Sequence, residues 1–285
     1  QWWKLASKNR NVLAFGVKGD GVTDDTAAFQ ALVSEGGLIV IPDNVTIRLT
    51  ATIFVYQPVA IIGAGCVLHK ALEESSRNVR GPGSWFFLDH LGVGFNFVGI
   101  SAPNQTSGIA VQRMTGCGTY RNQPIPSGST FTPLNASWDI QVTDLELQLE
   151  DFVFLNPTRA LAAELGRGGR LRLNAVRGQP LTTGISIDKC YDVCHLDVHF
   201  WPYWSLHPSV HAHTYANLQA LVTGRVDGLL LQRFFCIYAN IAWVVRDNGS
   251  GSLNRAHADW AYLDNVVKGI VIDSNVNGAS IHCNA

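Results

Sequence analysis

The sequence predicts an all-β solenoid, in which short strands wind into coils that stack on one another. Strand-like runs separated by turn residues recur along the chain, and comparable runs lie about 22 to 36 residues apart, the length of one coil with its loops. Some runs alternate strictly between apolar and polar residues, as over Leu145–Glu150 and His195–Phe200, which is typical of strands with one buried face. No long helical pattern separates the runs, which argues against a doubly wound α/β fold.

The composition agrees with a solenoid. Of the 285 residues, 47% are hydrophobic and only 15% are charged, which is a low charged fraction. A solenoid accounts for this balance because each coil is largely interior. The net charge of −1 gives no sign of a nucleic-acid partner. No apolar run has the length of a membrane span, so we expect no membrane insertion.

The first predicted element is a short helix over residues 24–34. Thr23 is a good N-cap, and the two aspartates that follow it place negative charge where the helix dipole favours it. Apolar residues then recur at helical spacing, and Gly36 and Gly37 end the helix. In a solenoid such a helix covers the open hydrophobic end of the stack.

Residues 15–32, followed by the runs 38–42 and 61–65, resemble the amino-terminal signature of the pectate-lyase-like right-handed parallel β-helix superfamily. The superfamily includes polysaccharide lyases, polygalacturonase-type hydrolases and bacteriophage tailspike depolymerases. The resemblance implies a right-handed, single-stranded parallel β-helix with a short amino-terminal capping α-helix. It divides the chain into a cap segment with its helix, residues 1–37, and a parallel β-helix, residues 38–285.

The later runs are interpreted as successive coils with two insertions. Residues 160–165 are interpreted as a short helical excursion. Residues 113–137, which are rich in Gly, Pro, Ser, Thr and Asn, and residues 201–217 are expected to be long surface loops. Such loops in a solenoid carry binding function or contact a neighbouring subunit. One interior column is expected to hold Leu147, Leu171, Leu196, Leu231 and Leu263.

The six cysteines are scattered, and none of their spacings matches a metal site. Cys190 and Cys194 are the closest pair. We interpret the cysteines as small buried hydrophobic residues, because a disulfide framework is not expected in a chain of this length. Free thiols agree better with assembly in a reducing cytoplasm, as for a virion protein, than with ordinary secretion.

The resemblance implies a polysaccharide substrate but supplies no complete catalytic set. The Asn-Thr-Asp, Asp-Asp, His-Gly and Arg-x-Lys motifs of polygalacturonases do not occur in order, and no dense acidic cluster is present for the calcium of pectate lyases. Tailspikes place their Asp and Glu pairs differently in each protein. Glycoside hydrolysis needs two carboxyl groups, about 5–5.5 Å apart for retention or about 6.5–9.5 Å for inversion. Carboxylates on adjacent coils, or two residues apart on one strand face, approximate these distances.

The catalytic candidates are outward-facing residues of three successive coils. Glu146 and Asp197 are the expected acid and base, and Arg172 is expected to bind an anionic sugar. In a lyase variant, Arg172 or His199 is the base for β-elimination beside a uronate carboxylate. The alternative is a solvated face whose charges alternate because stacked like charges repel.

The segment 201–217 is the expected binding segment, because sugars stack their apolar faces on aromatic rings and His and Tyr tips add hydrogen bonds. The alternative is that its tryptophans pack the loop onto the wall or fill a trimer interface. His207, His211 and His213 have a spacing that suits a metal, but Pro208 and the lack of further ligands argue against one, so no metal or cofactor is expected. The expected substrate-binding residues are Trp201, Tyr203, Trp204, His207, His211 and Tyr215.

Together these observations predict a phage tailspike-like protein that binds a bacterial surface polysaccharide and cleaves it by glycoside hydrolysis with paired carboxylates. One alternative is a free microbial polysaccharide lyase of the pectate-lyase type. Another is a non-catalytic structural fibre or glycan-binding adhesin. The tailspike resemblance implies a homotrimer, other virion tail proteins as partners and a place in the virion tail, whereas a free enzyme would be secreted.

Overall fold

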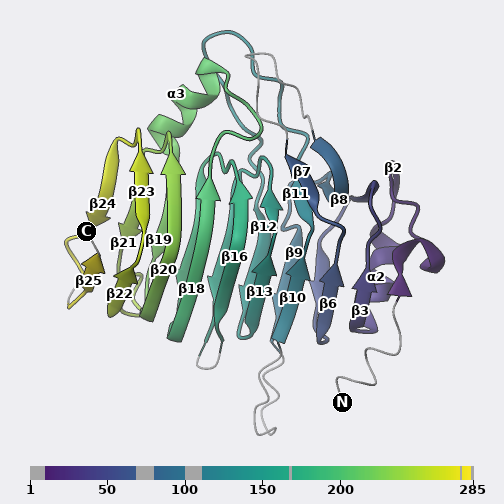
Figure 1. Cartoon of the computed structure of the whole chain (residues 1–285), viewed down its shortest axis with the longest axis horizontal. Helices are drawn as coiled ribbons and strands as arrows, with labels where there is room; N and C mark the ends of the chain where they lie inside the picture. Colours follow the sequence, from purple (N-terminus) through teal and green to yellow (C-terminus); the bar gives the residue numbers. More distant parts are fainter. Residues whose placement is uncertain (1–9, 69–79, 100–110, 167–168, 277, 284–285) are drawn as a thin grey trace, which may run out of the picture.

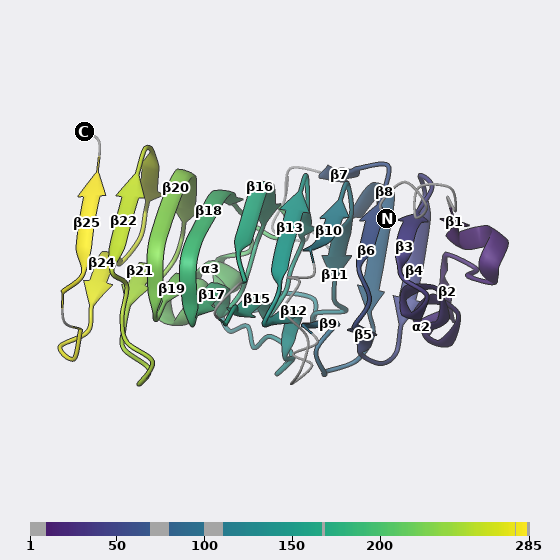
Figure 2. The ribbon, with the colours of Figure 1, turned by 90° about the horizontal axis from the view of Figure 1, so that it is seen from below.

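The computed structural model describes residues 10–68, 80–99, 111–166, 169–276 and 278–283. Within them the chain forms a parallel β-helix, which confirms the predicted fold (Figures 1 and 2). The strands of successive coils lie side by side in a 17-stranded sheet and an 8-stranded sheet. Among the described strand pairs, only β7 (Cys66–Leu68) and β8 (Arg80–Leu88) run antiparallel.

Each complete coil has three strand positions. The first position holds β1 (Arg10–Asn11), β3 (Gly37–Val40), β6 (Val59–Ile62), β10 (Val111–Thr115), β13 (Glu146–Glu150), β22 (Arg255–Ala258) and β25 (Ser280–Cys283). The second holds β2 (Asp20–Asp24), β4 (Val45–Leu49), β8, β11 (Gly118–Tyr120), β14 (Val153–Phe154) and β23 (Ala261–Asp264). Three long strands fill both positions: β16 (Leu171–Gly178), β18 (Cys190–Phe200) and β20 (Val226–Ile237). The third position is the 8-stranded sheet: β5 (Ile53–Val55), β9 (Phe95–Val98), β12 (Trp138–Thr143), β15 (Arg159–Glu164), β17 (Thr183–Asp188), β19 (Gln219–Thr223), β21 (Ile241–Val245) and β24 (Lys268–Ile272).

The core consists of columns of inward-facing apolar residues from successive coils. Leu147 and Leu171 share one column, and Leu196 and Leu231 share the next, two residues further along the strands. Leu263 lies in the second strand position, beside the end of β20. The predicted single column of leucines is therefore wrong. Inward faces repeat every two residues, so one long strand contributes to several columns.

Helix α2 (Thr26–Ser34) covers the amino-terminal end of the stack, after the short 3-10 helix η1 (Val12–Phe15) (Figure 1). It buries Phe29, whose ring packs edge-on against Phe86 with the centroids 5.3 Å apart. The N-cap residue is Asp25 and not Thr23, so the helix begins later than predicted. The Asp25 carboxylate accepts the backbone N–H groups of Lys18 and Gly19 at 2.7 and 2.9 Å, and it thereby fixes the turn before the helix. The helix and the coils share one continuous hydrophobic core.

The two predicted long loops contain regular structure. The segment 113–137 includes the end of β10 and all of β11, so its irregular part is shorter, residues 121–137. The second half of 201–217 is helix α3 (Pro208–Asn217), which begins where Pro208 takes the first helical turn. Residues 160–165, interpreted as a helical excursion, instead belong mainly to strand β15, whose alternating buried positions fit the coil interior.

The two insertions pack against each other in a second hydrophobic core outside the coils. Phe131 from the first insertion meets Trp204 from the second, with ring centroids 5.8 Å apart. Trp85 and Leu155, from the wall of the β-helix, lie in the same core. This outer core builds a ridge on the second strand position, and α3 rises above the coils there (Figure 1).

A fully buried ion pair anchors the first insertion. Arg121 Nε lies 2.7 Å from Asp139 Oδ1, and both side chains are 0% exposed. The Arg121 guanidinium also donates to the carbonyl oxygens of His90 and Gly92. These charge-assisted hydrogen bonds tie the start of the insertion to β12 and to the turn between β8 and β9 in the preceding coil.

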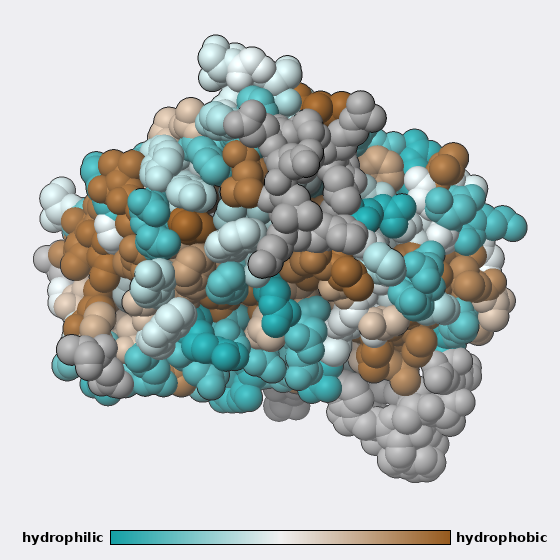
Figure 3. All heavy atoms as spheres, turned by 45° about the horizontal axis from the view of Figure 1, so that its top comes forward, coloured by the Kyte–Doolittle hydropathy of each residue, from teal (hydrophilic) through white to brown (hydrophobic). Residues whose placement is uncertain are grey.

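Apolar side chains gather at the surface of the carboxy-terminal coils, on the left in Figure 3. They include Val267, Ile270 and Ile272, which are 57%, 42% and 53% exposed. Ile270 and Ile272 follow the inward-facing positions of β21 and therefore continue two core columns. Neither described helix is long and apolar enough to span a membrane.

Candidate functional site

A cleft opens on the outer wall where the long strands bend from the first position to the second, a point we call the corner. At the corner β16 places two outward residues, Asn174 and Ala175, and β20 places two, Gln232 and Arg233. Strand β18 places only one, Asp197, so the register shifts on both sides of it. Because β18 is one residue shorter here, Asp197 is recessed between its neighbours and is only 7% exposed. Such irregularities re-aim side chains and are frequent next to active sites.

Arg233 holds this recessed carboxylate. Its Nε donates to Asp197 Oδ1 at 3.1 Å, and its Nη2 donates to Oδ2. The arginine side chain is 61% exposed while the aspartate side chain is 9% exposed. The pair therefore has a buried acid and a cation that faces solvent. The hydrogen bond to Asp197 raises the pKa of Arg233, which keeps its positive charge in place.

Two residues beyond Asp197, the ring of His199 meets the hydroxyl of Tyr203. His199 Nδ1 and the Tyr203 oxygen lie 2.7 Å apart. Burial lowers the pKa of His199, and the nearby cation of Arg177 lowers it further. Burial also raises the pKa of Tyr203. A neutral imidazole joined to a protonated phenol is a pair of groups suited to proton transfer.

An aromatic column continues from His199 toward the carboxy-terminal coils. His199, Phe235 and Tyr262 occupy the same position on three successive coils. Their rings stack, with centroid separations of 4.5 and 5.4 Å and interplanar angles of 20° and 11°. Trp260 lies two residues before Tyr262, and its ring is nearly parallel to that of Tyr262 with the centroids 5.8 Å apart.

The cleft that these groups share has a volume of about 340 Å³. Among the described residues that line it, Asp197 is the only carboxylate, and Arg177 and Arg233 are the cations. Tyr203 packs on the outer core, so the second insertion forms one side of the cleft. The lining residues are Ala175, Val176, Arg177, Asp197, Val198, His199, Tyr203, Arg233, Phe235 and Trp260.

The four predicted catalytic residues fall into two groups. Asp197 and His199 line the cleft, whereas Glu146 and Arg172 lie together outside it, with Arg172 Nε 3.8 Å from Glu146 Oε1. The strand register places Glu146 two coils from Asp197 and four residues away along the strand direction, on the order of 15 Å. The structure therefore does not bring the predicted acid and base together.

The predicted binding residues also separate. Tyr203 lines the cleft, and the ring of Trp201 lies 5.5 Å from it. Trp204 is 2% exposed in the outer core, so its role is packing, as the alternative interpretation held. His207 is the N-cap of α3, and its ring nitrogen accepts the N–H of Ser209.

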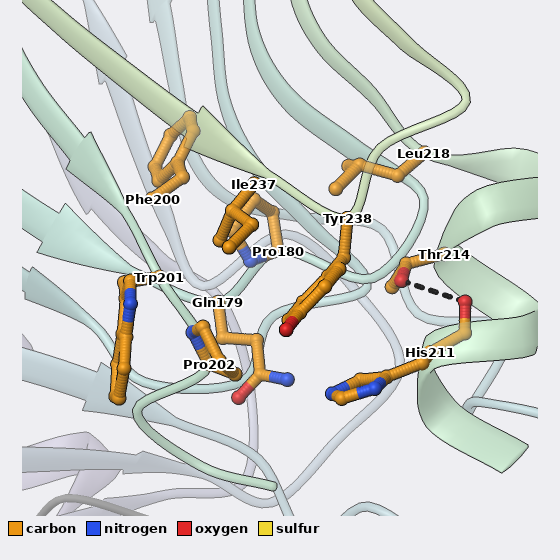
Figure 4. A pocket seen from close by; sticks show the side chains of 10 residues that line it. All are labelled: Gln179, Pro180, Phe200, Trp201, Pro202, His211, Thr214, Leu218, Ile237 and Tyr238. Carbon is orange, nitrogen blue, oxygen red and sulfur yellow. Dashed lines mark hydrogen bonds between the residues drawn. The ribbon is translucent and has the colours of Figure 1, made fainter. Parts of the chain in front are cut away.

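His211 and Tyr215 project from α3 toward Tyr238, at the turn after β20. The His211 ring stacks on Tyr238 with the centroids 4.3 Å apart, and Tyr215 meets the same ring edge-on. Figure 4 shows His211 and Tyr238 on one side of a small hollow and Trp201 on the other. This hollow holds only about 10 Å³, which is too little for a sugar ring. These aromatic residues therefore attach α3 to the coils.

Sequence reasoning missed three cleft residues: Arg177, Arg233 and Phe235. The shifted register hides Arg233, because equal coil lengths would not pair it with Asp197. A signal for the aromatic residues was present. Phe234 faces inward and Phe235 outward, and Trp260 and Tyr262, two residues apart, are both exposed. Among the described residues, no group of three or more His, Cys, Asp or Glu side chains is placed to hold a metal ion.

Comparison with known families gives one match, at the amino-terminal end. A family model described as rhamnogalacturonase A/epimerase, pectate lyase-like, matches residues 9–80. This confirms the resemblance to pectate-lyase-like proteins over the cap helix and the first coils. All the described lining residues of the cleft lie outside the matched range. No curated protein matches the sequence.

Several solved structures are similar to the chain at low identity. ORF18 of Geobacillus virus E2 is 12% identical with a TM-score of 0.39, over 95% of this chain and 62% of that one. The A-module of a mannuronan C-5 epimerase from Azotobacter vinelandii is 14% identical with a TM-score of 0.35, over 97% and 87%. The catalytic unit of a thermostable GH87 α-1,3-glucanase from Streptomyces thermodiastaticus is 12% identical with a TM-score of 0.26, over 98% and 69%. This chain thus spans 62% of the length of the phage protein.

Proposed function

We propose that the cleft binds an acidic polysaccharide and cleaves it by β-elimination next to a uronate. The observation that carries this proposal is the set of groups in the cleft. A His199–Tyr203 hydrogen bond of 2.7 Å lies in the same cleft as Arg177 and Arg233. Within the part of the chain that the structure describes, the lining contains no carboxylate besides the ion-paired Asp197.

Elimination needs a base, an acid and a cation. The base removes the proton on the carbon next to the uronate carboxylate, and the negative charge that develops spreads onto that carboxylate. The electron pair then forms a carbon–carbon double bond as the glycosidic carbon–oxygen bond breaks, and the leaving oxygen takes a proton. His199, kept neutral by its lowered pKa, suits the base, and the Tyr203 hydroxyl suits the acid. Arg177 and Arg233 suit stabilisation of the developing charge.

Hydrolysis by paired carboxylates is supported less well. That reaction needs two carboxyl groups within about 9.5 Å of each other. Glu146 lies outside the cleft, and Asp197 is neutralised by Arg233. We therefore propose the lyase alternative, in which His199 is the base, in place of the hydrolase with Glu146 and Asp197 that was preferred from the sequence.

The biological setting rests on the amino-terminal resemblance alone. We propose with it a tailspike-like role on a bacterial surface polysaccharide, as a homotrimer joined to other virion tail proteins. Sedimentation of the purified chain tests the trimer, and a monomer at all concentrations would contradict it.

The activity is tested by incubating the purified protein with polygalacturonate, alginate, hyaluronan and uronate-containing bacterial capsules. New reducing ends together with the ultraviolet absorbance of unsaturated uronates are expected for at least one of them. Reducing ends without that absorbance would indicate a hydrolase, and binding without either product would indicate an adhesin. Both results would overturn the elimination proposal.

A further inference from the structure

We infer that Trp260 and Tyr262 form a sugar-stacking subsite, which extends the cleft along the solenoid axis toward the carboxy-terminal coils. Its ligand is the apolar face of a pyranose ring in the same glycan chain whose acidic sugar lies near the arginines. The inference rests on the glycan-binding part of the proposed function. It adds a second contact region and a requirement for a polymeric ligand.

The first observation is that Trp260 belongs to the cleft and is nevertheless open to solvent. Its side chain lines the cleft together with Arg233 and Phe235, and the residue is 48% exposed. Tyr262, two residues later in β23, is 51% exposed. Large aromatic residues at a cleft mouth offer a rigid apolar surface at low cost in side-chain entropy.

The second observation is continuity across the coils. Arg177, His199, Phe235 and Tyr262 follow one another on four successive coils. Three coil spacings correspond to about 14 Å, which is longer than one pyranose ring. Arg177 lies on β16, and the exposed aromatic pair lies three coils further on, with Trp260 just before β23 and Tyr262 within it. A chain that reaches both regions therefore has more than one sugar unit.

The third observation is the polar flank of the aromatic pair. His257 Nε2 and Asp259 Oδ1 lie 2.9 Å apart immediately before Trp260, and both side chains are about half exposed. A sugar that stacks on an aromatic face needs hydrogen-bonding groups at the edge of the ring for its hydroxyls. The sequence supplies such groups next to Trp260.

The chain offers a matched aromatic pair away from the cleft. Phe54 lies in β5, and Tyr56 follows the end of that strand. Their ring centroids are 6.1 Å apart with an interplanar angle of 5°, and the residues are 42% and 49% exposed. Neither residue lines the cleft. The Phe54–Tyr56 pair thus has the same exposure and ring geometry as the Trp260–Tyr262 pair. What distinguishes the Trp260–Tyr262 pair is its position next to Arg233. The Tyr56→Ala variant is the control for general loss of an exposed ring.

The test measures binding separately from cleavage. In a His199→Ala background, we would titrate galacturonic acid, oligogalacturonides of graded length and the glycans of the activity panel by calorimetry. Trp260→Ala is expected to weaken binding of the long ligands by at least about tenfold. The same variant should leave binding of the monosaccharide unchanged, and Tyr56→Ala should leave all affinities unchanged.

The outcomes separate this inference from the proposed function. Trp260-dependent binding by a native protein that cleaves nothing would support the subsite and contradict elimination. Cleavage with the same KM and the same length dependence in the Trp260→Ala variant would overturn the subsite and keep elimination. An equal loss of affinity in the Tyr56→Ala variant would also overturn the subsite. Failure of every acidic glycan to bind would count against both.

Discussion

Two acid–arginine pairs lie on the same outer wall, and their surroundings differ. Arg172 and Glu146 approach to 3.8 Å, with the arginine side chain 52% exposed and the glutamate side chain 12% exposed. Arg233 and Asp197 form a closer, two-point contact, and the acid is recessed at the corner of β18. The second pair also lies beside a ridge built by the outer core.

This comparison shows that the pattern of charges on successive coils does not define a site. Both pairs have the residue types that sequence reasoning sought. Only the second has a neighbouring histidine with a lowered pKa, a tyrosine held by an insertion and a concave surface. The Arg172–Glu146 contact is long and its arginine is exposed to solvent, so we expect the weak, screened interaction of a surface salt bridge. The cleft is therefore a product of the corner and the insertions, and the coils alone do not create it.

The largest expected effect is a loss of activity when the cleft residues beside the Arg233–Asp197 pair are changed, and not when the Arg172–Glu146 pair is changed. Tyr203→Phe and His199→Ala should each lower kcat/KM by about 10²–10⁴-fold, because general acid–base groups contribute that much to rate. Arg172→Gln, outside the cleft, should leave kcat/KM unchanged. Initial rates of unsaturated-uronate formation measure both. Loss of activity in the Arg172 variant with full activity in the His199 variant would contradict the proposal that the catalytic groups lie in the cleft.

The next effect concerns the ridge that distinguishes the two surroundings. Trp204→Ala should lower the free energy of unfolding by about 3–5 kcal/mol, because it empties a large buried site in the outer core. Urea unfolding measures the change. Trp260→Ala, which removes an exposed ring of the same type, is the control and should cost much less. Equal losses would show that the outer core does not stabilise the insertion.

A smaller effect compares the two acids directly. Glu146→Gln should change the free energy of unfolding by less than about 1 kcal/mol, because the Arg172 contact that it weakens is long, at 3.8 Å, and the new amide oxygen can still accept from Gln148 Nε2. Asp197→Asn should cost more, because it leaves a recessed amide opposite a cation. Paired urea titrations of the two variants and the parent measure the difference. A larger loss in the Glu146 variant would contradict the assignment of Asp197 as the recessed partner.

The smallest effect is a shift in pH dependence. Activity should fall as the pH drops through the pKa of His199, because the protonated ring is no longer a base. Burial and then Arg177 hold that pKa below its ordinary value, so the acid limb lies below the usual histidine range. Arg177→Gln removes one of these causes and should move the limb to higher pH. A limb that stays in place, or that moves to lower pH, would exclude His199 as the titrating base.

The coil architecture and the cap helix were predictable from the sequence because their signals are local. Alternation over His195–Phe200 sets inward and outward faces, and Asp197 and His199 were correctly placed outside. The turn and helix near Asp25 have their own composition signals. Interior columns were less predictable, since several inward positions on each strand, such as Leu171 and Leu173, are equivalent in pattern.

The composition of the cleft was not predictable because it depends on register between distant strands. Arg233 lies 36 residues beyond Asp197, and a one-residue difference at the corner decides whether they meet. The outer core was hidden for the same reason, since Phe131 and Trp204 come from separate insertions. Trp204 and Tyr203 are adjacent in sequence, yet one is buried in packing and the other lines the cleft.

The shorter corner of β18 has a consequence for how such a protein changes over evolutionary time. The residues that differ in number at the corner all face outward, and the inward columns return to register on either side. A single-residue insertion or deletion there therefore deepens or fills the cleft while leaving the core contacts in place. In this architecture, the shape of the ligand surface can diversify by length variation at one point of a coil, while the inward positions on either side keep their partners.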